Sequence, residues 1–334
     1  MALNSRPFVT IAVPVLNEEH YIGSCLQSLL LQAPSRGCEI LVLDGGSTDR
    51  TIKIVSAIAA MYPCIRIVNN PKRLQSAAIN LAARIAAPQS TVIMRADAHS
   101  LYPPNFFQDC IAALTSTRAT SVVVPMRTFG RNGFQRAAAA AQNSRLGNGG
   151  SPLRIPGRSG FVETGHHAAL DHQFFIAVGG YNDAFTPNED AEHDLRAVRA
   201  GGRIWMCAEA TITYFPRRDP TSLARQYFRY GTARARTLFA HRARPKLRQL
   251  APLFILAGCA SGVVLAPVSP ASALVPLFYA STCLSWGAVA AVRQHDMLLL
   301  AMGPAAMIMH LSWAAGFVWT CIAPGKIRRL RPTV

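Results

Sequence analysis

The sequence predicts an α/β fold with a Rossmann-like, mainly parallel sheet, followed by C-terminal hydrophobic transmembrane helices. Up to Val124 the chain alternates short β-rich segments with helical patterns, an order typical of βαβ units with right-handed crossovers. Between Gln249 and Gly325, by contrast, only Arg293 and Asp296 are charged. We therefore expect a globular α/β domain first and a membrane-embedded part after it.

Hydrophobic periodicity defines the individual elements. Strands are expected at residues 9–13, 39–43, 65–68, 91–94 and 121–124. Helices are expected between them at residues 18–32, 48–61, 74–86 and 105–115. The stretch 127–165 is rich in Gly, Ser, Asn and Arg, so we expect one helix at 135–145 and then a mobile loop that contacts substrate. A helix at 190–200, a strand at 203–207 and a helix at 221–238 complete the pattern.

The uneven distribution of charge divides the chain into parts. Residues 1–216 hold 19 Lys and Arg against 15 Asp and Glu, whereas residues 217–248 hold ten basic residues and one acid, Asp219. We expect an α/β catalytic domain at 1–216, a basic amphipathic interface region at 217–248, membrane segments at 249–325 and a basic tail at 326–334.

The net charge of +17 would suit nucleic acid or an anionic membrane. The excess lies next to apolar segments, where a basic residue gains ~1 kcal/mol from anionic headgroups. No recognisable nucleic-acid module accompanies it. We therefore expect membrane lipids, and no nucleic acid, as partners.

Three apolar runs, at 250–268, 271–292 and 297–323, are each long enough to cross a hydrocarbon core, which takes about 20 residues. One such run could be a buried core helix, but three in succession favour membrane insertion. The number of crossings stays open. A cytoplasmic catalytic domain and a basic cytoplasmic tail require an even number, so one run could be re-entrant or interfacial.

The cysteine pattern is consistent with a cytosolic compartment for the first part of the chain. Eight cysteines are scattered without a C-x-x-C pair or metal-like spacing, so we expect reduced thiols. The apolar run at 8–16 does not resemble a secretory signal, because it contains Pro14 and lacks a basic leader.

The first candidate site residues follow the first strand, since ligands of parallel α/β sheets bind at the carboxyl ends of the strands. Pro14, Asn17 and Glu18 stand there and are expected to cradle the nucleotide part of a donor. Alone this motif is weak, because the start of a helix also favours Asn and Glu.

Asp44 ends the second strand and precedes Gly45 and Gly46, which let the backbone come close to a ligand. A carboxylate only accepts hydrogen bonds, which suits the N–H of a uracil ring. Helix capping would account for Ser47 and Asp49 but not for Asp44. We therefore expect Asp44 to bind the donor.

Asp97 and His99 stand just past the fourth strand, two positions apart. A carboxylate and an imidazole at this spacing could hold a divalent cation, Mg²⁺ or Mn²⁺, against a diphosphate. The metal would neutralise charge that builds up on a departing nucleotide. The Asp-x-His pattern is weak by itself, and its place at a strand end strengthens it.

An acidic cluster begins the helix expected at 190–200, with Glu189 and Asp190 followed by Glu192 and Asp194. Acids at a helix N-terminus could simply complement the helix dipole. Group transfer to a hydroxyl, however, needs a carboxylate that takes the hydroxyl proton. We expect Asp190 to be this base and Glu189 to contact the acceptor.

Gln226, Arg229 and Tyr230 lie in the basic helix before the apolar runs. Their spacing of i, i+3 and i+4 places them on one face. The arginines of this helix could instead serve a lipid-facing amphipathic helix. An amide and an aromatic ring suit a sugar, so we expect the three residues to bind the acceptor.

These motifs together resemble those of the family 2 inverting glycosyltransferases. The strings PVLNE, DGGSTD, DAH, GGYNDAF…NED and QYFRY stand in that family's order and at its approximate spacing. NNPKRLQSAAINLA and MRADAHSLYPPNFF resemble more narrowly the glycosyltransferases of succinoglycan and related exopolysaccharide biosynthesis. The resemblance covers residues 8–238 and extends loosely through the hydrophobic tail.

The resemblance implies a GT-A fold and a UDP-sugar donor. Asp44 would contact uracil, and Asp97 would serve the ribose and the metal. His99 stands where the family usually has the second Asp of D-x-D, so the identity of the metal stays open. Asp190 would be the catalytic base.

Gln226 and Arg229 would match the family's Q-x-x-R-W, with Tyr230 in place of Trp, which argues against the processive subgroup. The resemblance implies inverting transfer of a sugar, glucose from UDP-glucose, to a saccharide linked to polyprenyl diphosphate. The enzyme would lie in the bacterial inner membrane with its catalytic domain in the cytoplasm. Other polysaccharide-assembly proteins could be partners.

Three alternatives stay open. An enzyme that charges polyprenyl phosphate itself with a sugar would need no base for a hydroxyl, and the Gln226/Arg229 motif argues against it. A dinucleotide-binding oxidoreductase would carry a G-x-G-x-x-G after the first strand, which the sequence lacks. The third is a non-catalytic membrane subunit of a polysaccharide-assembly complex.

Overall fold

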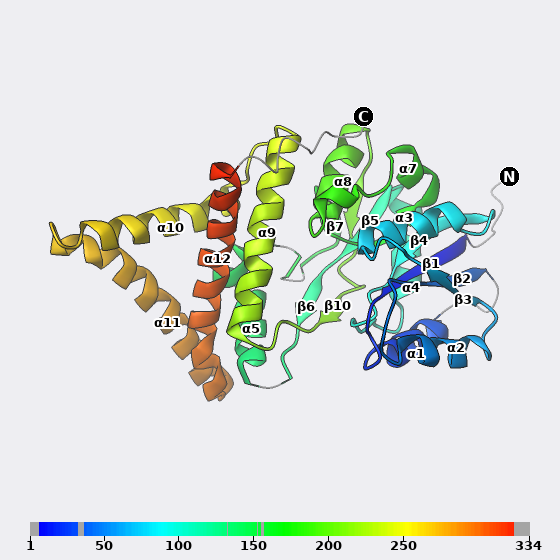
Figure 1. Ribbon diagram of the computed structural model, residues 1–334, viewed down its shortest axis with the longest axis horizontal. Coiled ribbons are helices and arrows are strands. Elements are labelled where there is room, and N and C mark those ends of the chain that lie inside the picture. The colour runs from blue at the N-terminus through cyan, green and yellow to red at the C-terminus, as the bar shows by residue number, and fades with distance from the viewer. Residues whose placement is uncertain (1–6, 33–36, 132, 152, 155–156, 324–334) are drawn as a thin grey trace. The chain divides into compact units, whose positions relative to one another are not determined.

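The computed structural model describes residues 7–32, 37–131, 133–151, 153–154 and 157–323, and the expected basic tail at 326–334 lies outside them. The chain divides into two compact units (Figure 1). The first comprises Met1–Met126 and Pro156–Tyr214, and the second comprises Arg127–Ile155 and Phe215–Val334.

An eight-stranded sheet forms the centre of the first unit, in the order β3-β2-β1-β4-β8-β5-β9-β7. Strands β3, β2, β1 and β4 run parallel, β8 is antiparallel to both β4 and β5, and β9 is parallel to β5. The strands are β1 (Phe8–Val15), β2 (Cys38–Asp44), β3 (Ile65–Asn69), β4 (Ser90–Arg95), β5 (Ser121–Val124), β7 (Gly160–Val162), β8 (His166–Asp171) and β9 (Ile204–Met206). The predicted mainly parallel α/β architecture is confirmed.

Helices cover both faces of this sheet because the side chains of each strand alternate between two cores. Val13 of β1 packs with Leu26 and Phe106 on one face, whereas Ala12 packs with Ile79 on the other. The helices are α1 (Ile22–Gln32), α2 (Thr51–Ala59), α3 (Gln75–Ile85), α4 (Phe106–Thr117), α7 (His172–Ala177) and α8 (Glu189–Arg199), with a short 3-10 helix at Asp183–Phe185.

Strand β8 is the main departure from the predicted elements. It inserts antiparallel between β4 and β5, so its first residues lie at the edge where β4 ends. The periodicity of this six-residue strand is obscured by His166 and His167, which begin it. The short strands β6 (Met126–Thr128), β7 and β10 (Ile212–Tyr214) were also not predicted.

The second unit is helical, with α5 (Gly133–Asn143), α6 (Arg145–Asn148), α9 (Pro220–Ala240), α10 (Leu247–Leu265), α11 (Leu274–Gln294) and α12 (Met302–Ile322). Its core joins Ala138 and Ala141 of α5, Leu223 of α9, and Met302 and Met309 of α12. This packing explains why Arg127–Ile155 groups with the C-terminal helices, whereas the sequence placed it within a domain at 1–216. The small alanine face of α5 allows α12 to approach closely.

Three helical segments are long and apolar enough to cross a membrane: Leu247–Leu265, Pro270–Gln294 and Met297–Ile322. They coincide with the three apolar runs of the sequence. All eight cysteines are free thiols, as their spacing predicted.

Candidate active site

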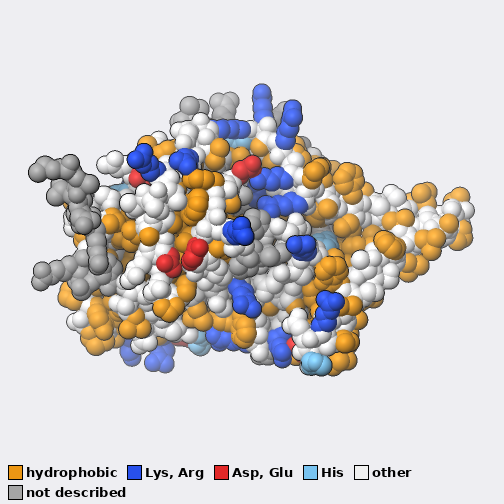
Figure 2. All heavy atoms as spheres, turned by 180° about the vertical axis from the view of Figure 1, so that it is seen from behind, with side chains coloured by type: hydrophobic (Ala, Val, Ile, Leu, Met, Phe, Trp, Pro, Cys, Tyr) orange, Lys and Arg blue, Asp and Glu red, His pale blue; other side chains and the backbone are white. Residues whose placement is uncertain are grey.

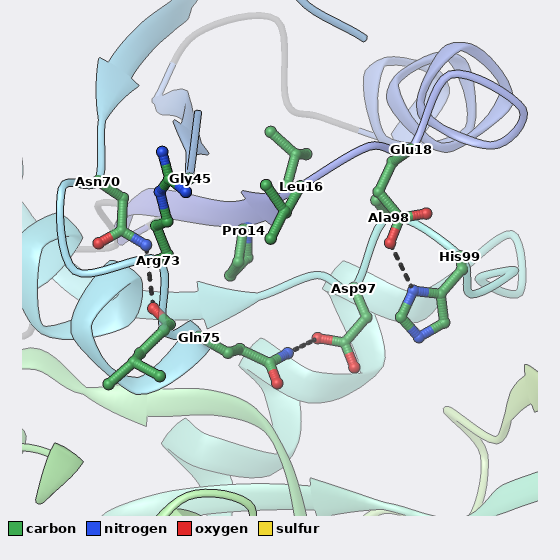
Figure 3. A pocket seen from close by; sticks show the side chains of 12 residues that line it. Pro14, Leu16, Glu18, Gly45, Asn70, Arg73, Gln75, Asp97, Ala98 and His99 are labelled. Carbon is green, nitrogen blue, oxygen red and sulfur yellow. Dashed lines mark hydrogen bonds and ion pairs between the residues drawn. The ribbon is translucent and has the colours of Figure 1, made fainter. Parts of the chain in front are cut away.

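A pocket opens where the carboxyl ends of β1, β2 and β4 meet at one edge of the sheet (Figure 3). Of the residues predicted to bind the donor, Pro14, Glu18 and Asp97 line it, and so does the predicted metal ligand His99. The remaining lining residues are Val15, Leu16, Gly45, Asn70, Arg73, Leu74, Gln75 and Ala98. The pocket therefore combines apolar side chains with two carboxylates, an imidazole, two amides and a guanidinium.

The loop after β1 is fixed by hydrogen bonds to the loop after β2. Asn17 adopts a left-handed conformation with φ of 57°, and its side chain accepts a hydrogen bond of 2.8 Å from the backbone N–H of Thr48. The backbone N–H of Glu18 donates to the hydroxyl of Thr51 at 2.8 Å. Asn17 thus shapes the loop, whereas Glu18 directs its carboxylate into the pocket (Figure 3).

Asp44 holds its own loop together. Its carboxylate accepts hydrogen bonds from the backbone N–H of Gly46 at 3.1 Å and from the N–H and hydroxyl of Ser47 at 3.0 and 2.6 Å. Gly46 has φ of 86°, a conformation that favours glycine. The predicted donor-binding Asp44 therefore shapes the turn whose next residue, Gly45, lines the pocket.

Asp97 is buried and held on several sides. Arg95 donates to Asp97 Oδ1 from Nε at 3.0 Å, and Gln75 donates to the same oxygen at 2.6 Å. Its second oxygen, Oδ2, lies 3.6 Å from His166 Nε2. Burial alone would raise the pKa of Asp97, but the charges of Arg95, His166 and His99 outweigh it, so the pKa is lowered well below its usual range.

Asp190 lies in the first turn of α8, and its Oδ1 accepts a hydrogen bond of 2.8 Å from Nη1 of Arg95. Its Oδ2 lies 3.8 Å from His166 Nδ1, and its Oδ1 lies 3.7 Å from His167 Nδ1. Burial would raise the pKa of Asp190, yet Arg95, His167 and His166 together lower it. The candidate base is therefore a carboxylate at neutral pH.

His167 is fully buried behind Asp190. Its Nε2 lies 2.7 Å from Asp194 Oδ1, and its Nδ1 lies 2.6 Å from the hydroxyl of Tyr181. Burial would lower the pKa of His167, but attraction to Asp194 and Asp190 raises it. The backbone N–H of Gly165 donates to the second oxygen of Asp194 at 3.1 Å, which fixes this row of side chains.

Glu189, the residue predicted to contact the acceptor, is 5% exposed. Burial, followed by repulsion from Asp190, raises the pKa of Glu189 to about 7. Its Oε2 has no hydrogen-bond partner among the described residues. The two adjacent carboxyl groups therefore differ in pKa. Asp190 accepts a hydrogen bond from Arg95, whereas burial dominates at Glu189.

Asp97 and His99 offer ligand chemistry suited to Mg²⁺ or Mn²⁺, an oxygen and a nitrogen at the pocket wall. His99 Nδ1 lies 3.1 Å from Glu18 Oε1, which orients the imidazole as outer-shell carboxylates do (Figure 3). A second group, His167, His193 and Asp194, has ligand atoms within 4.8 Å of one another. Because both nitrogens of His167 lie at hydrogen-bond distance from Asp194 and Tyr181, this group fits a metal less well.

The residues predicted to bind the acceptor on α9 belong to the second unit. Gln226 is buried, and its Nε2 donates to the Tyr230 hydroxyl at 2.9 Å. Arg229 is exposed. Gln226 and Tyr230 thus share one face of α9, as their spacing indicated.

Several polar residues of the site were not predicted. Arg95 ends β4 directly after three apolar residues, a signal that the sequence did contain. Arg73 and Gln75 lie in a string that carried the family resemblance. His166 and His167 could not be placed, because they reach the site through the unpredicted strand β8.

The comparisons with known proteins agree with this fold. Residues 10–179 match the model of glycosyl transferase family 2. The succinoglycan biosynthesis protein ExoA of Rhizobium meliloti (strain 1021) is 42% identical over 308 residues, 92% of this chain and 93% of that protein. A dolichyl N-acetyl-alpha-D-glucosaminyl phosphate 3-beta-D-2,3-diacetamido-2,3-dideoxy-beta-D-glucuronosyltransferase of Methanococcus voltae is 35% identical over 28% of this chain and 30% of its own length.

Among solved structures, the mannosyltransferase PcManGT from Pyrobaculum calidifontis, in complex with GDP-Man and Mn²⁺, has the same fold. It superposes with a TM-score of 0.64 at 19% identity, covering 95% of this chain and 88% of that chain. Half of the chain matches the family model, and the ExoA protein of Rhizobium meliloti is similar over nearly its whole length. The chain belongs to glycosyl transferase family 2 and is a glycosyltransferase of the GT-A fold.

Proposed function

We propose that the protein is an inverting glycosyltransferase of exopolysaccharide biosynthesis of the succinoglycan type. It transfers glucose from UDP-glucose to a saccharide linked to polyprenyl diphosphate. The observation that carries the proposal is Asp190, a half-buried and ionised carboxylate held by Arg95 beside Asp97 of the pocket. Similarity to the succinoglycan biosynthesis protein ExoA supports the pathway.

The proposed reaction is a single displacement at the anomeric carbon. The acceptor hydroxyl gives its proton to Asp190, its oxygen bonds to the anomeric carbon, and the bond to the UDP oxygen breaks on the opposite face. Arg95 keeps Asp190 ionised and fixes its orientation. Attack opposite the leaving group inverts the configuration of the sugar.

Asp97 and His99 would hold an Mg²⁺ or Mn²⁺ ion, and the PcManGT structure supports this choice because it is a complex with GDP-Man and Mn²⁺. Such an ion neutralises charge on the departing diphosphate when it is bound. Arg73 lies in the same pocket and supplies a further positive charge. Pro14, Asn17, Glu18 and Asp44 shape or line the donor side.

On the acceptor side we place Glu189, Gln226, Arg229 and Tyr230. A lipid-linked saccharide is supported by the Methanococcus voltae relative, whose name describes a dolichyl-linked substrate. An acceptor of this kind also gives a reason for three candidate membrane helices in the same chain. We place the enzyme in the bacterial inner membrane, with its catalytic unit in the cytoplasm and with membrane lipids and other polysaccharide-assembly proteins as partners.

A donor and acceptor screen tests the proposal. The purified full-length protein is given a panel of nucleotide sugars with either polyprenyl phosphate or a polyprenyl-diphosphate saccharide, and nucleotide release and product are measured. We expect UDP-glucose and the diphosphate-linked saccharide to be used, and NMR of the product to show inversion. Exclusive use of polyprenyl phosphate would favour the alternative transferase, and a retained configuration would refute the mechanism.

A further inference from the structure

The three apolar helical segments of the second unit differ in how far protein covers them. Each segment contains an apolar stretch of 18 residues. The share of that stretch that is buried is 6% in Leu247–Leu265, 22% in Pro270–Gln294 and 39% in Met297–Ile322. Gly262 is the one buried residue of α10 among those described, whereas α12 has nine buried residues. The three segments have the same mean hydropathy of 1.5, but they differ in packing.

Helix α12 lies side by side with α9 (Figure 1). The two backbones approach closely at glycines: a Cβ on Gly231 would collide with the carbonyl of Trp313, and one on Gly316 with the carbonyl of Phe228. His310 of α12 lies with its Nε2 2.8 Å from the backbone carbonyl oxygen of Leu146 in α6. Helix α12 is therefore bound to α9, α5 and α6 and cannot move into lipid without them.

Helix α9 is unsuited to the hydrocarbon core. Within Pro220–Ala240 it carries four arginines, and it is not among the segments apolar enough to cross a membrane. Arg225 and Arg229 are exposed. If α12 spanned the bilayer, its partner α9 would bring these guanidinium groups to the depth where charged side chains are most unfavourable.

Helices α10 and α11 form the two arms of a V whose turn stands away from α9 and α12 (Figure 1). The arms meet near this turn, where the Ser272 hydroxyl donates to the carbonyl of Gly262 at 2.9 Å. No residue from Ala266 to Ala273 is charged. In Figure 2 this part of the second unit is a protrusion of apolar and uncharged atoms.

The two ends of the V, at the start of α10 and the end of α11, are by contrast charged. Arg242, Arg244 and Lys246 are exposed just before α10 begins. At the end of α11 stands Arg293, and Asp296 pairs with Arg136 of α5 at 2.6 Å. Cations at both ends of the V and none at its turn are typical of a helical hairpin that enters a bilayer from one side.

We propose that α10 and α11 enter the lipid bilayer as a hairpin, with the start of α10 and the end of α11 on one side. Helix α12 then lies in the interface of that same side together with α9. The exposed Val318, Trp319 and Ile322 of α12 then meet the boundary between headgroups and acyl chains, where tryptophan is favoured. Helix α12 is then the interfacial run, whether or not the proposed reaction is correct. This arrangement places the catalytic unit and the C-terminal end on one side of the membrane.

Depth-dependent quenching of tryptophan tests the arrangement. Two variants of the full-length protein keep one tryptophan each, Trp286 near the middle of α11 or Trp313 near the middle of α12, with the other three changed to Phe. Both are reconstituted in vesicles that contain lipids brominated near the headgroup or deep in the acyl chain. Deep bromines should quench Trp286 more strongly, and shallow bromines should quench Trp313 more strongly. Stronger quenching of Trp313 by deep bromines would overturn the proposal.

A second measurement needs no substitution in the helices. Protease-cleavable tags are added before Met1 and after Val334, and sealed membrane vesicles of both orientations are digested. Cleavage of both tags in the same orientation is expected. Cleavage of the two tags in opposite orientations would show a third crossing and refute the hairpin, whether or not the protein transfers sugar.

Discussion

The Arg95 guanidinium donates a hydrogen bond of 2.8 Å to the carboxylate of Asp190. Through its Nε the same side chain holds Asp97 at 3.0 Å. The side chain of Arg95, which is 5% exposed, thus joins the proposed base Asp190 to Asp97, which is proposed to bind the donor and the metal. Removing a partner from such a buried pair would leave an uncompensated charge, so the three groups act as one unit.

Asp190→Asn removes the proposed base while keeping the shape of the side chain. We expect turnover to fall by ~10²–10⁴, as loss of a general base does, with unchanged affinity for UDP-glucose. Steady-state UDP release and calorimetric donor binding measure the two effects. As a matched control, Asp183→Asn alters a carboxylate that pairs with Lys72 instead of Arg95, and it should keep most activity. Near-normal turnover of Asp190→Asn would refute the assignment.

His167→Asn removes the buried imidazole between Asp190 and Asp194. The positive charge of His167 helps to lower the pKa of Asp190, so its loss should raise that pKa. The acid limb of the kcat/KM profile should therefore move to higher pH, and kcat should fall while the donor KM is kept. A pH–rate profile of the variant measures the shift.

The neighbouring His166→Asn is the matched control for this prediction. Burial, together with the charge of Arg95, lowers the pKa of His166 to about 4, so this imidazole is neutral at pH 7. It also contributes less than His167 to the low pKa of Asp190. The acid limb should move less in His166→Asn. Equal shifts in the two variants would show that His167 has no special influence on Asp190.

Glu189 makes stability depend on pH. Its folded-state pKa of about 7 lies above the ordinary value of 4.5, so the folded protein binds more protons than the unfolded chain between these values. The stabilisation is fully present below about pH 4.5 and is lost as the pH rises through about 7. Glu189→Gln cannot ionise and should gain up to about 3 kcal/mol over the wild type between pH 4.5 and 8. Urea unfolding of both proteins in detergent measures the difference, and a pH-independent difference would contradict the raised pKa.

Asp97 and His99 are expected to hold the divalent cation that transfer requires. Chelation should abolish transfer, and added Mn²⁺ or Mg²⁺ should restore it. His99→Asp should stay active with a preference shifted toward Mg²⁺, because a carboxylate suits harder cations than an imidazole does. Activity with each ion across a titration measures the preference. Full activity in excess chelator would refute a metal role.

Sequence reasoning located the parts of the site that follow predicted strands. Asp97 and Glu18 follow strands of the parallel half, so adjacent strand ends brought them to one pocket. His166 and His167 lie on an antiparallel strand whose pairing depends on residues far away in the chain. Local periodicity carries no information about such pairing, which explains why these histidines were missed.

The membrane part shows the same limit. The three apolar runs were readable because hydropathy is a local property, and the helices lie where the runs predicted. Which of them is covered by protein depends on the glycines at 231 and 316 that bring α9 and α12 together. A contact between residues so far apart in the chain cannot be read from composition.

Arg229 on α9 is expected to bind the acceptor. A planar guanidinium can bind the acceptor diphosphate through paired hydrogen bonds, which a lysine reproduces poorly. Arg229→Lys keeps the charge, so binding to anionic lipid should be unchanged. Transfer at subsaturating acceptor should fall at least tenfold, which corresponds to the ~1.4 kcal/mol that a strong charge-assisted hydrogen bond contributes. Vesicle flotation and donor binding should match the wild type.

Arg225→Lys is the matched control, because Arg225 is also exposed on α9, one turn before Arg229. A position that only contacts lipid headgroups should tolerate lysine, since headgroup attraction depends on charge more than on geometry. Loss of transfer in Arg229→Lys alone would therefore separate acceptor binding from membrane binding. Equal activity of both variants and the wild type would show that α9 contributes charge only. In that case Gln226 and Tyr230, which hydrogen-bond to each other at 2.9 Å, would not form an acceptor site with Arg229.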